Sequence, residues 1–171
     1  MRQHTHDGRF EAELLYQVQV LLDTGQADKA LEALRSTGQR SKALLNAYGV
    51  CLMRTGQVDK ANAVFRNLVI PGQGFCLDPE APTIFKTNYA VALLLGKHVD
   101  GCIGVLNQIE DQAHPAVVKI RSAIEEWKRT LGRLRRFFIP ILGLPDTTVP
   151  MGFPPGDLWI KELDGPTRRA A

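Results

Sequence analysis

The residue types that most often perform catalysis or bind metals are sparse in this sequence and poorly spaced. The four histidines are His4, His6, His98 and His114. His4 and His6 alternate and could share a metal ion, but two ligands without a third make a weak site. No His-x-x-Glu-His and no Gly-x-Ser-x-Gly pattern occurs. The sequence therefore predicts a protein that is not an enzyme, with no cofactor and no metal site.

The three cysteines, Cys51, Cys76 and Cys102, form neither a disulfide framework nor a zinc pattern, because their number is odd and their spacing wide. Cys51 and Cys102 fall on apolar stripes of predicted helices, so we expect them to be buried small hydrophobic side chains. Cys76 lies in a predicted loop. Residues 1–8 lack the apolar stretch of a signal peptide, and no apolar run is long enough to span a membrane. We expect a cytoplasmic protein.

One seven-residue phrase occurs twice, and it indicates which elements position the polar side chains. Thr24-Gly-Gln-Ala-Asp-Lys-Ala30 returns as Thr55-Gly-Gln-Val-Asp-Lys-Ala61, 31 residues later. Leucines before the first copy form an apolar stripe at helical spacing. Gly25 can take the left-handed conformation that ends a helix, and Asp28 suits the start of the next one. The phrase predicts two helix–turn–helix pairs.

The apolar pattern around these phrases resembles the tetratricopeptide repeat (TPR) superfamily over residues 11–114. The second copy matches best, at Leu45, Tyr48, Gly49, Leu52, Gly56, Ala61, Phe65, Leu68 and Pro71. The first copy matches at Leu14, Val18, Leu21, Gly25, Ala30 and Leu34. A third copy matches at Tyr89, Ala90, Leu93, Gly96, Cys102, Leu106 and Ile109, with its turn offset by one residue. The resemblance implies an all-α fold, a short right-handed α-solenoid of about three helix–turn–helix pairs.

The rest of the chain divides around this array. Residues 1–9 are polar and predict a disordered N-terminal tail. Residues 10–138 form the predicted array, in which residues 115–138 are an amphipathic helix that caps its last open face. An insertion over residues 71–82 is too long for a tight turn, and we expect its Phe75 and Leu77 to pack against the repeats.

Concave grooves in TPR arrays are lined by the first helix of each pair, so the resemblance implies a peptide-binding groove. The matching positions are Tyr16, Gln19, Asp23, Asn46, Val50, Met53, Arg54, Thr87, Asn88 and Val91. Asn46 and Asn88 interest us most, because an Asn side chain offers a donor and an acceptor and can bind a peptide backbone of any sequence. Plain surface polarity or a local helix contact would explain them equally well.

Residues 139–171 contain six prolines but also many apolar side chains, unlike a typical disordered tail. We therefore expect this Pro-rich tail to lie against an apolar surface. Phe153, Pro154, Leu158 and Trp159 form the candidate ligand segment, since Pro-rich segments lose little entropy on docking. Docking in its own groove would give self-inhibition, and docking in a neighbour's groove, or contact through the edge of the array, would give a homodimer. Covering the flanks of the capping helix is the simpler alternative.

Basic residues gather near the end of the capping helix, whereas the net charge of the whole chain is only +3. The basic patch comprises Lys128, Arg129, Arg133, Arg135 and Arg136. Cations beside an apolar face suit an anionic membrane surface or RNA phosphates. Cations are also favoured at the C-terminal end of any solvated helix. The main prediction is thus a non-catalytic module that binds an extended peptide, and the alternative is a membrane-surface or RNA-associated adaptor acting through helix 119–138.

Overall fold

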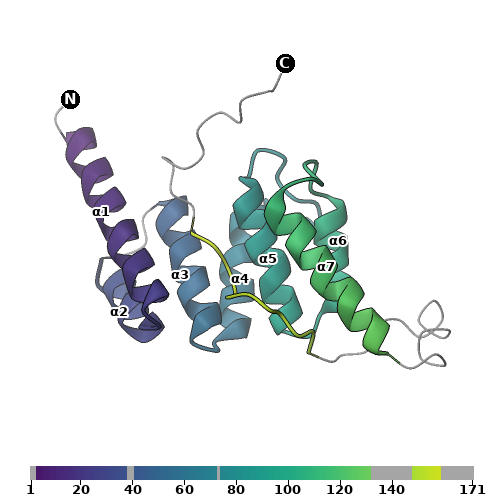
Figure 1. The fold of residues 1–171 in the computed structure, drawn as a ribbon. Helices are drawn as coiled ribbons and strands as arrows, with labels where there is room; N and C mark the ends of the chain where they lie inside the picture. Colours follow the sequence, from purple (N-terminus) through teal and green to yellow (C-terminus); the bar gives the residue numbers. More distant parts are fainter. Residues whose placement is uncertain (1–2, 38–40, 73, 132–147, 159–171) are drawn as a thin grey trace, which may run out of the picture.

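The structure is a computed structural model, and it describes residues 3–37 (residues 3–7 as backbone only), 41–72, 74–131 and 148–158. Within these residues the protein is all-α, with seven helices and no strand (Figure 1). In chain order the helices are α1 (Gln3–Asp23), α2 (Ala27–Thr37), α3 (Lys42–Arg54), α4 (Val58–Val69), α5 (Thr83–Leu95), α6 (Val99–Asn107) and α7 (Pro115–Thr130). None of them is long and apolar enough to cross a membrane.

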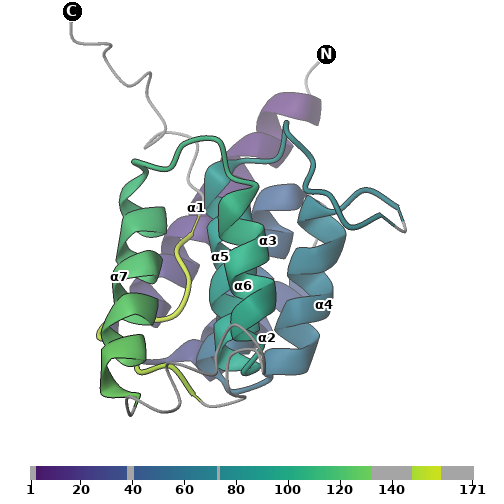
Figure 2. The same ribbon diagram turned by 90° about the vertical axis from the view of Figure 1, so that its right-hand side faces the viewer.

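Neighbouring helices in the sequence pack against one another from α1 through α6. The first helices of successive pairs also touch: α1 contacts α3, α3 contacts α5, and α5 contacts α7. These four helices line one face of the molecule, whereas α2, α4 and α6 lie behind them (Figures 1 and 2). The order of contacts places the predicted groove helices side by side, with α7 next to α5.

The duplicated phrase forms the same turn twice. Gly25 and Gly56 have φ angles of 73° and 75°, in the left-handed region that favours glycine. The next residue in each copy, Gln26 or Gln57, donates its backbone N–H to a carbonyl five residues earlier, at 2.8 Å in both cases. Its side-chain amide donates to the hydroxyl of the Thr that opens the phrase, and the Lys three residues later donates to the same amide's oxygen. One sequence thus gives one geometry at both sites.

The third helix pair makes the same turn with a different residue. Lys97 has a φ angle of 66°, and it is the one non-glycine residue with positive φ among those described. The backbone N–H of His98 donates to the Leu93 carbonyl at 2.8 Å, which is the same five-residue closure. The glycine of this turn, Gly96, therefore stands one position before the left-handed one, as the offset in the sequence indicates.

The core lies between the two layers of helices. Its largest fully buried side chains are Phe65, Phe85, Leu34, Leu52, Leu94, Leu106, Ile120, Val18, Val50, Val69, Val117 and Val149. Gly49 of α3 lies flat against the Phe65 ring, and a β-carbon there would be only 2.5 Å from the ring. The absence of a side chain at Gly49 lets α3 and α4 approach closely.

Two predicted boundaries are wrong. The first helix begins at Gln3, whereas the sequence predicted its start at residue 10. Residues 3–9 have no proline, and their single glycine, Gly8, does not stop the helix. At the other end, α7 finishes at Thr130, because Leu131 adopts an extended conformation (φ −71°, ψ 133°). The predicted continuation to residue 138 therefore fails at Leu131, and residues 132–138 lie outside the described residues.

The insertion after α4 packs only in part as predicted. Leu77 is buried, and its backbone N–H donates to the Gln108 side chain at 2.9 Å. Phe75 is 88% exposed and does not tuck against the repeats. A backbone hydrogen bond holds this loop against the end of α4: the Asp78 N–H donates to the Val69 carbonyl at 2.7 Å.

Candidate functional site: an occupied groove

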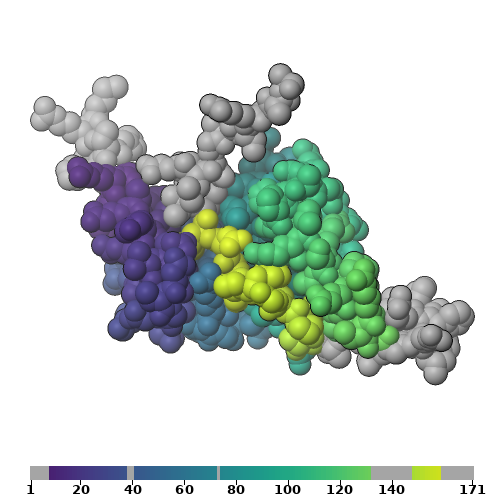
Figure 3. Space-filling model, in the orientation of Figure 1, coloured from purple at the N-terminus to yellow at the C-terminus, as the bar shows by residue number. Residues whose placement is uncertain are grey.

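Residues 148–158, called here the docked segment, run along the face formed by α1, α3, α5 and α7. The space-filling view shows the docked segment in yellow, filling the trough between the blue α3 region and the green α7 (Figure 3). Val149 is 2% exposed and Gly156 is buried, while Met151, Phe153 and Leu158 pack against the core with part of their surface open. The groove is therefore occupied in cis, by a part of the same chain.

Two asparagines hold the main chain of the docked segment. Asn88, on α5, accepts the N–H of Asp157 on its Oδ1 at 2.9 Å and donates its Nδ2 to the carbonyl of the same residue at 2.8 Å. The Nδ2 of Asn88 also donates to Asn46 Oδ1 at 2.8 Å, and Asn46 Nδ2 donates to the Asp157 carbonyl at 3.3 Å. Both asparagines are almost fully buried. The contact between α3 and α5 thus brings together two amides 42 residues apart in the sequence.

Arg54, the last residue of α3, binds the two preceding carbonyls of the docked segment. Its Nε donates to the Pro155 carbonyl at 3.2 Å, and one terminal nitrogen donates to the Gly156 carbonyl at 3.1 Å. The other terminal nitrogen donates to the Leu22 carbonyl, where α1 is ending, at 3.3 Å. Arg54 therefore ties the docked segment to two helices.

Gly156 lies directly on the groove floor. It has a φ angle of 77°, and a β-carbon on it would be 2.5 Å from Met53 Cε and 3.0 Å from a methyl group of Val50. Val50 and Met53 are among the positions that the TPR resemblance implied would face the groove. Gly156 was not singled out in the sequence, although a glycine after two prolines is a common turn signal.

Lys119 of α7 faces the docked segment from the other wall. Its Nζ lies 3.9 Å from Asp157 Oδ2 and 4.3 Å from the centre of the Phe153 ring. Both charged side chains are about half exposed, so the ion pair itself contributes little to stability. Sequence reasoning placed Lys119 only at the start of the capping and basic helix 119–138 and did not predict that it faces the docked segment.

The remaining predicted groove residues differ in their surroundings. Thr87 and Val91 of α5 are buried, and both line the thin gap beside Phe153. Tyr16 of α1 is 68% exposed, and Gln19 donates to Asp23 on the same helix at 2.7 Å. The structure thus brings the α3 and α5 positions together around the docked segment.

Among the predicted ligand residues, Phe153 and Leu158 are partly buried, Pro154 is exposed, and Trp159 lies outside the described residues. In the predicted basic patch, Lys128 pairs with Glu125 at 2.9 Å. Arg133, Arg135 and Arg136 lie outside the described residues, so the adaptor alternative stays a prediction.

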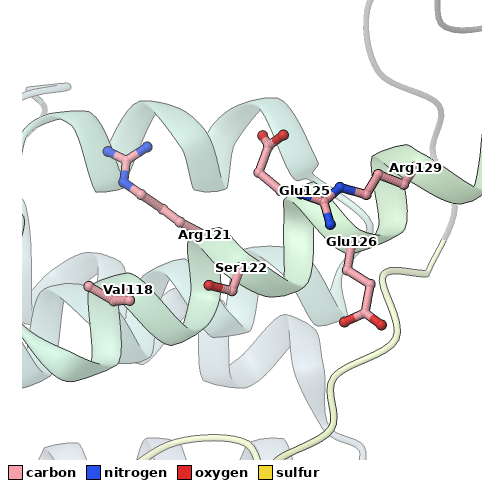
Figure 4. Close-up of a pocket in the computed structure, with 6 residues that line it drawn as sticks. All are labelled: Val118, Arg121, Ser122, Glu125, Glu126 and Arg129. Atoms are coloured by element: carbon pink, nitrogen blue, oxygen red, sulfur yellow. The ribbon is translucent and has the colours of Figure 1, made fainter.

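An open hollow of about 540 Å³ lies along α7 (Figure 4). Its lining comes from this one helix: Val118, Arg121, Ser122, Glu125, Glu126 and Arg129. Arg121 is already engaged, donating to Asn107 and Gln112 at 2.7–3.1 Å. A hollow with mixed charges and one described wall does not enclose a ligand.

The thiols and histidines provide no reactive centre among the described residues. Burial raises the pKa of Cys51 to about 12, against a smaller opposing influence of Arg54. Burial likewise raises the pKa of Cys102 to about 12. His114 caps α7 by accepting the Ala116 N–H at 3.2 Å. Within the part of the chain that the structure describes, no group of three potential metal ligands comes together.

Comparison with known proteins adds no assignment to this geometry. No protein-family model, no curated protein and no solved structure matches the chain. The case for a function therefore depends on the groove and its occupant.

Proposed function

We propose that this chain is a TPR-like α-solenoid acting as a non-catalytic protein-interaction module, whose concave groove binds an extended polypeptide segment. Its own residues 148–158 are an internal ligand that a partner must displace. The observation that carries the proposal is the two-way bond between the Asn88 side chain and the main chain of Asp157.

Main-chain recognition favours a peptide over a small molecule as the natural ligand. Among the described residues, Asn46, Arg54 and Asn88 make five hydrogen bonds to backbone atoms of residues 155–157. A groove that binds backbone amides in a fixed register is suited to any extended chain that can present them. Buried polar groups need partners, so the two buried asparagines would be costly in an empty groove that excluded water.

The test uses the full-length chain with the substitution Gly156→Val, which should eject the internal ligand. A fluorescent peptide with the sequence of residues 148–158 is then added, and its anisotropy is followed. We expect saturable binding, and we expect the binding to disappear when Asn88→Ala is added to the same chain.

Release of the internal ligand is monitored independently through the methionine methyl groups. Met53 Cε lies against Gly156, and the chain has only three methionines, so ¹³C-methyl labelling gives an assignable reporter. Gly152→Val is the matched control, because nothing lies within 4 Å of a β-carbon at that exposed position. If the methyl signal shows that the segment is released in the Gly156→Val chain and the added peptide still does not bind, the proposal is overturned.

A further inference from the structure

The docked segment meets the groove with its side chains as well as with its backbone. Three positions of the docked segment contact specific side chains of the array: Phe153, Gly156 and Asp157. Their spacing is fixed, because the asparagine pair binds the main chain of Asp157 and sets the register.

The first selective position requires a residue without a side chain. Val50 and Met53 form its floor, and they are 0% and 4% exposed. The backbone cannot lift away from this floor, because Arg54 holds the carbonyls of residues 155 and 156. The positive φ of Gly156 is a second barrier to any L-amino acid, independent of space.

The second and third positions share one cation. The Lys119 ammonium lies over the Phe153 ring and beside the Asp157 carboxylate, so it favours an aromatic residue and an acidic residue four positions apart. Between the docked segment and the groove, the centre of a water-sized sphere finds only about 10 Å³ of free space, lined by Thr87, Val91 and Ile120 among others. The fit leaves little room for larger side chains.

We propose that the partner of this groove is a protein containing an extended, proline-rich segment of the form aromatic-x-x-Gly-acidic, which competes with residues 153–157. This inference rests on the proposed function and specifies its ligand. The α7 helix supplies the selective cation, so it acts as a wall of the binding site in addition to covering the end of the array.

The experiment first ranks peptides on one acceptor chain, so the folding of that acceptor affects every peptide in the ranking alike. The full-length Gly156→Val chain is the acceptor, and a second acceptor, Asp157→Pro, removes the N–H that binds Asn88. The peptides carry the sequence of residues 148–158 either unchanged or with one substitution: Gly156→Ala, Gly152→Ala, Phe153→Ala, Asp157→Asn or Asp157→Lys.

We expect Gly156→Ala to weaken binding by about tenfold or more, from the cost of a left-handed L-residue, and Gly152→Ala to leave it unchanged. Asp157→Lys should weaken binding several-fold, and Lys119→Glu in the acceptor should restore it. Met53→Ala in the acceptor should recover part of the loss for the Gly156→Ala peptide, because it removes the closest atom.

The outcomes separate the two proposals. If the unchanged peptide binds and every substituted peptide binds within twofold of it, the groove binds backbone without selection and this inference is overturned. If the unchanged peptide binds to neither acceptor although the Met53 methyl signal shows an open groove, the proposed function falls as well.

Discussion

At the scale of single residues, one neutral amide organises the groove. Asn88 binds both the N–H and the carbonyl of Asp157, and only a side chain with a donor and an acceptor can do this. Asn46 accepts a hydrogen bond from the Asn88 amide and donates a longer hydrogen bond to the Asp157 carbonyl. The two residues therefore have unequal importance, although they look equivalent in the sequence.

Asn88→Ala should lower the free energy of unfolding by about 1–3 kcal/mol, since buried partners lose their hydrogen bonds. It should also shift the Met53 methyl signal toward that of the Gly156→Val chain. Asn46→Ala is the matched control, with a smaller effect on both readouts. Urea denaturation and methyl NMR measure them, and a larger effect of Asn46→Ala would contradict the hierarchy of contacts.

The buried thiols of Cys51 and Cys102 make stability depend on pH in the alkaline range. Their pKa values rise from 9.0 to about 12 in the folded protein, so the folded state keeps protons that the unfolded state loses. This stabilising contribution is fully present below pH 9 and is lost as the pH rises toward 12, with a slope of up to about 1.4 kcal/mol per pH unit for each thiol.

Denaturant titrations between pH 8 and pH 11 should show this decline, and a chain with Cys51→Ala and Cys102→Ala should show a shallower one. An identical slope in the two chains would mean that the thiols are not protected. Cys76 is exposed, so it should react with a thiol reagent in the native protein while the other two react only after unfolding.

Sequence reasoning at this scale could find Asn46, Asn88, Val50 and Met53, because their helical spacing and the TPR resemblance place them on one face. It could not find Gly156 or Lys119. The selectivity at Gly156 arises from the close approach of Met53, and the position of Lys119 beside Asp157 arises from how α7 packs on α5. Both depend on contacts between segments distant in the chain, which no local pattern reports.

At the scale of elements, the turns inside the three helix pairs allow a direct comparison of residues with positive φ. Gly25 and Gly56 take positive φ at little cost, whereas Lys97 takes it with a side chain. Lys97→Gly should raise the free energy of unfolding by about 0.5–1 kcal/mol. Gly56→Val should lower it by about 1–3 kcal/mol. Thermal and urea denaturation test both, and a stability loss for Lys97→Gly would show that the lysine side chain compensates for its conformation.

The glycines inside the helices provide a second matched pair. Gly49→Ala should destabilise the protein by about 1–3 kcal/mol, because its β-carbon would overlap the Phe65 ring. Gly104→Ala in α6 places the same methyl group in open space, so the better helix propensity of alanine should stabilise the protein by about 1 kcal/mol. In urea denaturation we expect the two substitutions to change the free energy of unfolding in opposite directions. A change in the same direction would mean that α3 and α4 are less closely packed.

Element boundaries were harder to predict than element positions. The repeated phrase determines where α1, α3 and their partners turn, because glycine and the capping threonine act locally. The start of α1 and the end of α7 lack such signals: residues 3–9 have no apolar stripe, and residues 131–138 keep an apolar pattern after the helix has stopped at Thr130.

At the scale of the whole molecule, the groove and its ligand are connected through the chain. Seventeen residues, 131–147, separate the end of α7 from the docked segment, and a tether of that length gives an effective concentration on the order of millimolar. For a peptide with a dissociation constant of about 10 µM, the internal ligand should weaken binding to the unsubstituted chain by about a hundredfold relative to the Gly156→Val chain.

Anisotropy titrations of the two chains measure this ratio directly. An intramolecular ligand also predicts that dilution leaves the Met53 methyl signal unchanged, since docking in cis does not depend on protein concentration. A signal that changes on dilution together with a change in mass by light scattering would indicate exchange of segments between two copies.

The order of groove and ligand along the chain has a consequence during synthesis. The helices that line the groove are complete by residue 130, whereas the docked segment begins at residue 148. At about 5–20 residues per second, the ribosome needs roughly one to four seconds to add the intervening residues. During this interval a nascent chain carries every groove residue but not residues 148–158, so a partner that bound the proposed groove at that stage would meet no internal competitor.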